Sequence, residues 1–362
     1  MKAYLALEDG TFLKGKGFGA KGRAEGELVF ETGMTGYVEA LTDPSYNGQL
    51  LMLTYPQVGN YGVTSKDYQS DGIKAESLVI RDLCRYPSNY RSEMDLDEFL
   101  KKYEIPGIED VDTRKLTRKA RIHGTMKAVL VTGEEREKEE LVEEAKEIES
   151  IKTKESLVPE VSNEKIRRYE SSGDLELVMI DCGYKSNILE NTLKEGINVT
   201  IVPYDTPADE ILEMDPDGVL ISNGPGNPAL LEKTISTIED LMGKTVVYGI
   251  CLGNQLISLA LGAETFKLKF GHRGINHPVK DLESGRVFIS TQNHGFAVTE
   301  ESLEEVGLEI TQVNLNDETV EAVEHKDMPI KAVQYHPEAG PGPHDTYFFF
   351  DELREDLEKN PF

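Results

Sequence analysis

Apolar runs alternate with helical patterns through the second half of the chain. Each run has the length of a buried strand and is followed by a segment in which apolar residues recur with helical spacing. This alternation predicts a parallel sheet whose strands are joined by right-handed crossovers. The expected strands are 177–180, 199–203, 218–221 and 246–250, and the expected helices are 185–195, 208–214, 229–242 and 252–262. Strand-like pieces follow over 279–334, and a closing helix over 346–359.

The first part of the chain, to about residue 131, has a different pattern. It is rich in glycine and in short β-like runs, with helical patterns only at 96–103 and 112–124. The charge-dense stretch from residue 134 carries a thin apolar stripe, which predicts a solvated helix leading into a linker. We therefore predict a β-rich α+β domain over 1–131, a charged helix and linker over 132–174, and an α/β domain with a mostly parallel sheet over 175–362.

Composition narrows the class of partner. The 362 residues carry a net charge of −27, which argues against nucleic acid and anionic membranes, since both need a cationic surface. The uncharged stretch 245–263 contains glycine, asparagine and glutamine, so it indicates a buried strand turning into a helix rather than a membrane span. Three cysteines without paired spacing, and no secretory pattern at the start, favour a reducing environment. We expect a cytoplasmic protein.

A cysteine between two glycines stands where the expected strand 246–250 meets the helix 252–262. The local sequence is Gly-Ile-Cys-Leu-Gly at 249–253, which has the form of a nucleophile elbow with cysteine in place of serine. Glycines permit the sharp turn, and the start of a helix stabilises a thiolate and offers free N–H groups to an oxyanion. The pattern predicts that Cys251 is a nucleophile at the carboxyl edge of the sheet.

A histidine and a glutamate stand two residues apart, far along the chain from the cysteine. On an extended segment His336 and Glu338 face the same side, and Pro337 between them fixes the backbone. A thiol nucleophile needs a base, and the base needs an orienting group, so the pattern predicts a Cys251–His336–Glu338 triad. The plain alternatives are a buried structural thiol, a hydrogen-bonded core histidine and a surface carboxylate.

Three motifs together resemble those of the class I glutamine amidotransferases. They are GICLGNQ at 249–255, YHPE at 335–338 and the loop NGPG at 223–226. Other motifs resemble the small subunit of carbamoyl phosphate synthetase in particular: KFGHRG at 269–274, NHPV at 276–279, QNHGF at 292–296 and PGPHD at 341–345.

The first domain carries a resemblance of its own. FETGMTGY at 30–37, DPSY at 43–46, TYP at 54–56, GNYG at 59–62 and DTRKLTR at 112–118 are similar to the extra domain of that small subunit. The amidotransferases of anthranilate and GMP synthetases lack this domain. The resemblance covers nearly the whole chain, with the linker as its loosest part.

The resemblance implies a site for L-glutamine. Its catalytic residues would be Cys251, His336 and Glu338, with the N–H groups of Leu252 and Gly224 holding the oxyanion. One position departs from the family pattern, because Asn254 stands where this subfamily often has histidine. We expect a change in local hydrogen bonding there and none in the triad. The implied glutamine-binding residues are Ser45, Gly224, Gly226, Leu252, Gln255, Asn293, Gly295 and Phe296.

The resemblance also implies a partner. Ammonia would pass through an internal tunnel to a large synthetase subunit, which makes carbamoyl phosphate from bicarbonate and ATP for pyrimidine and arginine biosynthesis. ATP and a divalent metal are expected on that partner, in a heterodimer or a higher oligomer. This chain has no Walker A sequence, and we expect it to hold no cofactor and no metal. Two alternatives stay open: an amidotransferase subunit of another synthetase, and a non-catalytic scaffold for a large subunit.

Two further patterns receive plain interpretations. Residues 17–22 fit GxGxxG but precede a β-like run rather than a helix, so we interpret them as hairpin glycines. His272, His277 and His294 do not have the spacing of metal ligands. We expect them to make local hydrogen bonds.

Overall fold

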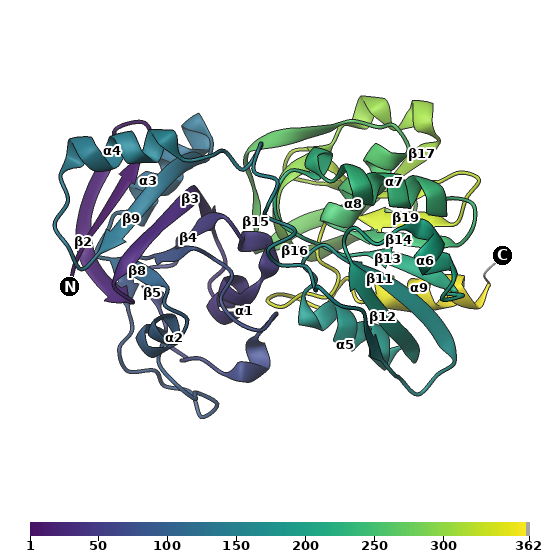
Figure 1. Ribbon diagram of the computed structural model, residues 1–362, viewed down its shortest axis with the longest axis horizontal. Coiled ribbons are helices and arrows are strands. Elements are labelled where there is room, and N and C mark those ends of the chain that lie inside the picture. Colours follow the sequence, from purple (N-terminus) through teal and green to yellow (C-terminus); the bar gives the residue numbers. More distant parts are fainter. Residues whose placement is uncertain (360–362) are drawn as a thin grey trace. The chain divides into compact units, whose positions relative to one another are not determined.

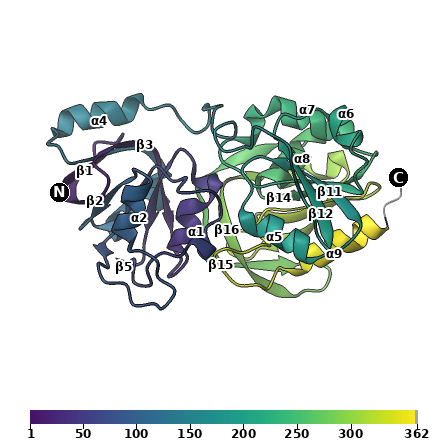
Figure 2. The same ribbon diagram turned by 60° about the horizontal axis from the view of Figure 1, so that its bottom comes forward.

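The computed structural model describes residues 1–359, which form two compact units (Figures 1 and 2). The first unit is Met1–Lys154 and the second begins at Glu155. The division falls inside the segment 132–174 that the sequence pattern assigns to a linker. Within residues 1–359, no helix combines the length and the apolar character needed to cross a bilayer.

A closed barrel forms the first unit, with strand order β1-β2-β8-β6-β4-β3-β9 (Figure 1). The pairs β3–β4, β4–β6 and β6–β8 are parallel, and the others are antiparallel. The strands are β1 (Lys2–Leu7), β2 (Phe12–Gly19), β3 (Gly22–Glu31), β4 (Gln49–Leu53), β6 (Ser77–Val79), β8 (Pro106–Glu109) and β9 (Met126–Thr132). Around them lie the paired β5 (Gln57–Val58) and β7 (Asp82–Leu83), the helices α1 (Tyr37–Thr42), α2 (Leu96–Lys102), α3 (Thr113–His123) and α4 (Lys138–Glu147), and the short 3-10 helices η1 (Pro44–Tyr46) and η2 (Ser65–Asp67). The predicted β-rich α+β character is confirmed.

Helix α4 packs on this barrel. Its apolar stripe, Leu141, Val142 and Ala145, is buried in one cluster with Tyr4 of β1 and Val129 of β9. The sequence pattern predicts the helix correctly but not its packing, because the stripe is thin and most of the surrounding residues are charged. Three adjacent apolar side chains are nevertheless enough to cover one side of two barrel strands. The charged residues of α4 occupy the opposite face.

The glycines at 17–22 do not form a hairpin. They end β2 and begin β3, and these two strands are not paired in the barrel. Gly19 has a φ of 67°, and a Cβ there would lie 2.4 Å from the carbonyl oxygen of Ile105. Glycine is thus needed for close approach of two chain segments. The absence of a following helix agrees with the rejection of a nucleotide-binding loop.

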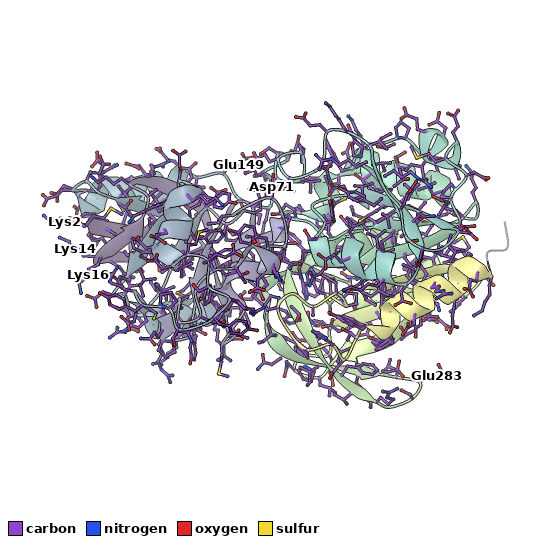
Figure 3. The ribbon with its side chains drawn as sticks, turned by 90° about the horizontal axis from the view of Figure 1, so that it is seen from below. Lys2, Lys14, Lys16, Asp71, Glu149 and Glu283 are labelled. Atoms are coloured by element: carbon purple, nitrogen blue, oxygen red, sulfur yellow. The ribbon has the colours of Figure 1, made fainter. Side chains whose placement is uncertain are left out.

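The outer side of the β1–β2 pair is basic. Lys14 and Lys16 are exposed on β2, and Lys2 lies opposite Lys16 in the strand register. Figure 3 shows these three side chains extending away from the barrel. Lys2 pairs with Glu135 and Lys16 with Asp110, so acidic neighbours offset part of this charge.

A ten-stranded sheet forms the second unit, in the order β10-β12-β11-β13-β14-β19-β18-β17-β15-β16 (Figure 1). Strands β12, β11, β13, β14 and β19 are parallel to one another, and the remaining pairs are antiparallel. The strands are β10 (Arg167–Tyr169), β11 (Leu175–Asp181), β12 (Ile197–Pro203), β13 (Gly218–Ile221), β14 (Val246–Ile250), β15 (Thr265–Asp281), β16 (Val287–Val298), β17 (Leu308–Asn314), β18 (Val320–His325) and β19 (Ile330–Val333). The predicted parallel sheet is confirmed.

Helices cover both faces of the parallel part (Figures 1 and 2). Alternate residues of β11 enter opposite cores: Val178 and Ile180 pack with α6, α7 and α8, whereas Leu177 and Met179 pack with α5 and α9. The helices are α5 (Ser186–Lys194), α6 (Ala208–Leu212), α7 (Glu232–Leu241), α8 (Leu252–Ala260) and α9 (Phe348–Glu358), with 3-10 turns at η3 (Pro228–Leu230), η4 (Glu300–Ser302) and η5 (Glu304–Val306). Since β11, β13, β14 and β19 run in one direction, the segments that follow them gather at one edge of the sheet.

Candidate active site

Cys251 lies in the sharp turn between β14 and α8. Its backbone angles, φ 54° and ψ −99°, fall outside the regions that L-residues favour, so the turn is strained as expected of a nucleophile elbow. A Cβ at Gly249 would lie 2.7 Å from the carbonyl carbon of Gly253, and a Cβ at Gly253 would lie 2.2 Å from the carbonyl oxygen of Ile221. The fold therefore requires glycine at both flanking positions.

His336 and Glu338 meet side by side on the segment after β19. Nδ1 of His336 lies 2.7 Å from Oε1 of Glu338, and both side chains are fully buried. The backbone N–H of His336 donates to the carbonyl oxygen of Thr291 on β16 at 2.9 Å, which holds the segment in place. The two-residue spacing thus places the pair as the extended pattern predicts.

The imidazole of His336 is set up to receive a proton. Its Nε2, on the opposite side of the ring from Glu338, is buried and makes no hydrogen bond of ordinary geometry. Burial is the largest single influence on the pKa of His336 and lowers it, and Lys185 lowers it as well, but the Glu338 carboxylate and the nearby Cys251 thiolate together raise it by more. A raised pKa favours the imidazolium that forms when a thiol gives up its proton to this ring.

A buried lysine holds the carboxylate. Lys185, directly before α5, is 1 % exposed, and its Nζ lies 2.9 Å from Oε1 of Glu338 and donates to the carbonyl oxygen of Ala339. Burial raises the pKa of Glu338, whereas Lys185 first and His336 second lower it, and the net shift is downward. The carboxylate therefore stays ionised between two cationic partners. Lys185 acts through Glu338 as a positioning residue.

Replacing Lys185 by methionine should destabilise this unit. We expect Lys185→Met to lower the free energy of unfolding by about 3–5 kcal/mol, because breaking a buried ion pair leaves a charge less compensated. The ionised Glu338 contributes stability that is present above its unfolded pKa and lost as pH falls through its folded pKa. Without Lys185 the folded pKa of Glu338 rises, so this stability is lost at a higher pH. Urea unfolding at neutral and acidic pH measures both effects.

Lys194→Met provides the matched control for that experiment. Lys194 is exposed at the other end of the same helix, where it donates to Asn191 at 3.0 Å. The control should unfold within about 0.5 kcal/mol of the native chain, as surface substitutions usually do. Equal free energies of unfolding for the two variants would contradict the buried ion pair.

A network of amides surrounds the thiol. Nε2 of Gln334 donates to Sγ of Cys251 at 3.6 Å, and its Oε1 accepts from Gln255 at 3.0 Å and from Asn254 at 3.4 Å. Nε2 of Gln255 also donates to the carbonyl oxygen of Phe296 at 2.8 Å. Both N–H groups of Gln255 are thus committed to the protein, which leaves its Oε1 as the end of the amide suited to a ligand. Asn254, the departure from the family pattern, thus donates to the same Gln334 amide that donates to the thiol.

The loop after β13 lies beside the first residue of α8. A Cβ at Gly224 would lie 2.1 Å from the carbonyl oxygen of Cys182 and 2.8 Å from Cδ2 of Leu252, so only glycine fits there. Gly226 has a φ of 92°, which also favours glycine. The first N–H groups of a helix have no acceptor within it, so the N–H of Leu252 is suited to an oxyanion.

Strand β16 brings the other predicted ligand-binding residues toward the thiol. Sγ of Cys251 lies 3.8 Å from the carbonyl oxygen of Asn293. Gly295 and Phe296 follow on the same strand, and Phe296 is tied to Gln255 as described above. Contacts in the second unit thus link Cys251 to Asn293 directly and to Gln255 and Phe296 through Gln334.

Ser45 belongs to the first unit. It lies in η1, is 2 % exposed, and its N–H donates to the Asp43 carboxylate at 2.9 Å while its carbonyl oxygen accepts from Gln49. Its contact with glutamine remains a prediction from the resemblance.

Sequence reasoning missed two residues of the site, Lys185 and Gln334. A single lysine at the start of an amphipathic helix normally indicates a solvated side chain, and its carboxylate partner lies 153 positions further along the chain. Gln334 gave a weak signal, since it directly precedes the YHPE motif. Its amide could have been considered as a donor to the thiol.

This arrangement suits addition of a thiolate to a carbonyl group. A strained, buried cysteine lies near a histidine that an ionised glutamate orients, and the N–H groups at the start of α8 lie beside the cysteine. Such groups supply a nucleophile, a proton acceptor and an oxyanion site, which are the parts of acyl transfer.

Two known protein families match the chain, one in each of its two units. The family "Glutamine amidotransferase class-I" matches residues 178–355, and "Carbamoyl-phosphate synthase small chain, CPSase domain" matches residues 5–130.

Individual relatives match along almost the whole chain. The carbamoyl phosphate synthase small chain of Archaeoglobus fulgidus is 61 % identical, with 97 % of each chain covered. The proteins of the same name from Methanocaldococcus jannaschii and Methanopyrus kandleri are 54 % and 52 % identical, each with 98 % of both chains covered.

Proposed function

The chain belongs to the carbamoyl phosphate synthase small chain family, and on that premise we propose that it hydrolyses L-glutamine at Cys251 and supplies the ammonia to a large synthetase subunit. The observation that supports the proposal is that Cys251 lies close enough to His336 to act on its pKa and that His336 contacts Glu338, although His336 and Glu338 lie more than 80 positions along the chain from Cys251.

The first half of the reaction forms a thioester and ammonia. The Cys251 thiolate attacks the carboxamide carbon of glutamine, and the N–H groups of Leu252 and Gly224 hold the oxyanion of the tetrahedral intermediate. His336 carries the proton taken from the thiol and gives it to the amide nitrogen. The C–N bond then breaks, which leaves a γ-glutamyl thioester on Sγ and releases ammonia.

The second half restores the thiol. His336, now neutral, takes a proton from water as the water oxygen attacks the thioester carbonyl. The C–S bond breaks, glutamate leaves, and the proton returns to the sulfur. Glu338 contacts His336 and Lys185 holds Glu338, so these two residues keep the imidazole oriented through both halves. Neither of them exchanges a proton with the substrate.

Glutamine would be held by the residues that the resemblance names. Oε1 of Gln255 and the backbone groups of the Asn293–Phe296 stretch suit the α-ammonium and α-carboxylate of the substrate, and Gly224 and Gly226 allow close approach of the backbone. Ser45 would add a contact from the first unit. Each of these roles is part of the proposal.

The proposed partner uses the ammonia. A large subunit with bound ATP and a divalent metal would convert bicarbonate to carboxy phosphate, which ammonia attacks on the way to carbamoyl phosphate for pyrimidine and arginine biosynthesis. A tunnel between the subunits would keep ammonia from being protonated in bulk water. We propose a heterodimer as the basic assembly and the cytoplasm as its location.

Co-purification with a much larger ATP-using chain tests the partnership. Tagged protein from its native cells should retain that chain, and the complex should make carbamoyl phosphate from glutamine, bicarbonate and ATP. We expect glutamine turnover by the complex to exceed that of the free subunit. Ammonia donation to a different synthetase would favour the first alternative function, and a complex that uses only free ammonia would favour the scaffold.

A further inference from the structure

Two histidines and a glutamate from three strands of the second unit meet in a buried cluster. The register of β15 and β16 places His272 opposite His294, and Glu321 comes from β18. One potential ligand atom of each residue lies within 4.8 Å of those of the other two. The three residues are 6 %, 5 % and 0 % exposed, respectively. The spacing along the chain hides this cluster, because strand pairing and not sequence proximity creates it.

The hydrogen bonds of the two imidazoles leave one nitrogen lone pair on each ring. Nδ1 of His294 lies 2.7 Å from the carbonyl oxygen of Phe296, and Nε2 of His272 lies 2.8 Å from the Asp317 carboxylate. Carbonyl and carboxylate oxygens only accept, so each of these nitrogens carries the proton of a neutral ring. The expected local hydrogen bonds of these two histidines are thus confirmed. The remaining nitrogens, Nε2 of His294 and Nδ1 of His272, are acceptors.

Neither of these two ring nitrogens meets a hydrogen-bond donor. Nδ1 of His272 and Oε2 of Glu321 are buried without a hydrogen-bond partner. Nε2 of His294 lies 2.7 Å from Oε1 of Gln292, whose own Nε2 donates to Glu321 at 2.7 Å. A lone pair held against a carbonyl oxygen is unfavourable unless something positive lies near both. A cation held between the unpartnered His272 Nδ1 and Glu321 Oε2 would satisfy both atoms.

We propose that His272, His294 and Glu321 bind a divalent metal ion of the zinc class. Two imidazole nitrogens and one carboxylate oxygen are the donors that Zn²⁺ prefers, and Oε1 of Gln292 is suitably placed as a fourth. The bonds from the opposite ring nitrogens to a carboxylate and a backbone carbonyl are the outer contacts that orient metal-bound histidines.

The charges around the cluster accommodate such an ion. With Glu321 ionised, Glu321 and Asp317 supply two negative charges against the one positive charge of Arg273, so the group then carries −1 without the ion. This site is separate from the triad but adjoins it along β16. His294 lies between Asn293 and Gly295, and the carbonyl oxygen of Phe296 accepts from both His294 and Gln255. The ion would therefore fix the position of the Asn293–Phe296 segment, to which the proposed function assigns glutamine binding.

Cobalt binding to the metal-stripped full-length chain tests the proposal, and it needs no catalytic activity. We expect one Co²⁺ per chain, with visible d–d absorption and without the near-ultraviolet band of a cobalt–thiolate bond, and we expect Zn²⁺ to displace it. Glu321→Gln should weaken binding by more than the roughly 10–100-fold that loss of an outer contact costs, and Asp317→Asn should weaken it within that range. His123→Gln, at an exposed position in the first unit, should bind as the native chain does.

Glu321→Gln changes a buried residue and could unfold the chain. Asp317 is partly exposed, so Asp317→Asn should fold and keeps the test decisive in that case. Failure of the native chain to bind Co²⁺ would overturn the proposal and favour a proton on Glu321, whose pKa burial raises to about 7. A thiolate band that disappears on alkylation of Cys251, or affinities unchanged in both variants, would also overturn it.

Discussion

Cys251→Ser should abolish glutamine-dependent synthesis while ammonia-dependent synthesis by the complex survives. Serine keeps the size and the strained backbone position, but its hydroxyl is a far weaker nucleophile than a thiolate in a site built around a sulfur atom. Loss of a catalytic nucleophile reduces kcat by about 10⁴-fold or more in comparable triads. Ammonia release from glutamine and carbamoyl phosphate formation from added ammonium measure the two arms separately.

Cys84→Ser serves as the matched control for the nucleophile. Cys84 lies in the first unit, partly exposed, with its thiol near the carbonyl oxygen of Tyr86 at 3.5 Å. This variant should retain both activities. Unchanged glutamine use by Cys251→Ser would end the triad proposal, and loss of both activities in it would indicate that the substitution disrupts the fold or the complex.

His336→Asn should lower the rate of glutamine hydrolysis by about 10²–10⁴-fold, the range that a general acid–base group contributes. Asparagine can still hydrogen bond to Glu338, so the buried carboxylate keeps a partner, but the amide cannot take the proton of Cys251. The native rate should depend on the protonation states of Cys251 and His336. The residual rate of the variant should lose the dependence that comes from His336. A pH profile of kcat for both proteins measures this difference.

Two comparisons define the role of His336 further. His344→Asn changes an exposed histidine on the loop before α9 and should leave the profile unchanged. Glu338→Gln removes the charge that raises the pKa of His336, so the imidazole should lose its proton at a lower pH than in the native chain. A His336→Asn variant with native rate and native pH profile would exclude this residue as the base.

Local patterns predicted the elements that carry the proposed nucleophile and the proposed base. The strand β14, the helix α8 and the turn at Cys251 follow from an apolar run, a helical stripe and two glycines, all of which are local signals. The pairing of His336 with Glu338 follows from their two-residue spacing. Family motifs then supplied the predicted glutamine-binding residues, which no periodicity could identify.

The features that were not predicted depend on contacts between distant segments. Lys185 is buried only because the segment after β19 brings Glu338 against it, and a lysine alone normally indicates a solvated position. The pairing of His272 with His294 depends on a hairpin with irregular register, interrupted between Lys267 and His272. Tertiary packing also decides that α4 lies on the barrel. These are consequences of strand order and register, which single-sequence patterns do not encode.

Mass analysis of the Cys251 peptide after acid quenching during glutamine turnover tests the central claim most directly. The account predicts a γ-glutamyl group on the Cys251 sulfur that accumulates with substrate, decays when substrate is exhausted, and is absent after prior alkylation of the thiol. Steady release of ammonia with no adduct at Cys251, or from a chain whose Cys251 is fully alkylated, would contradict the account.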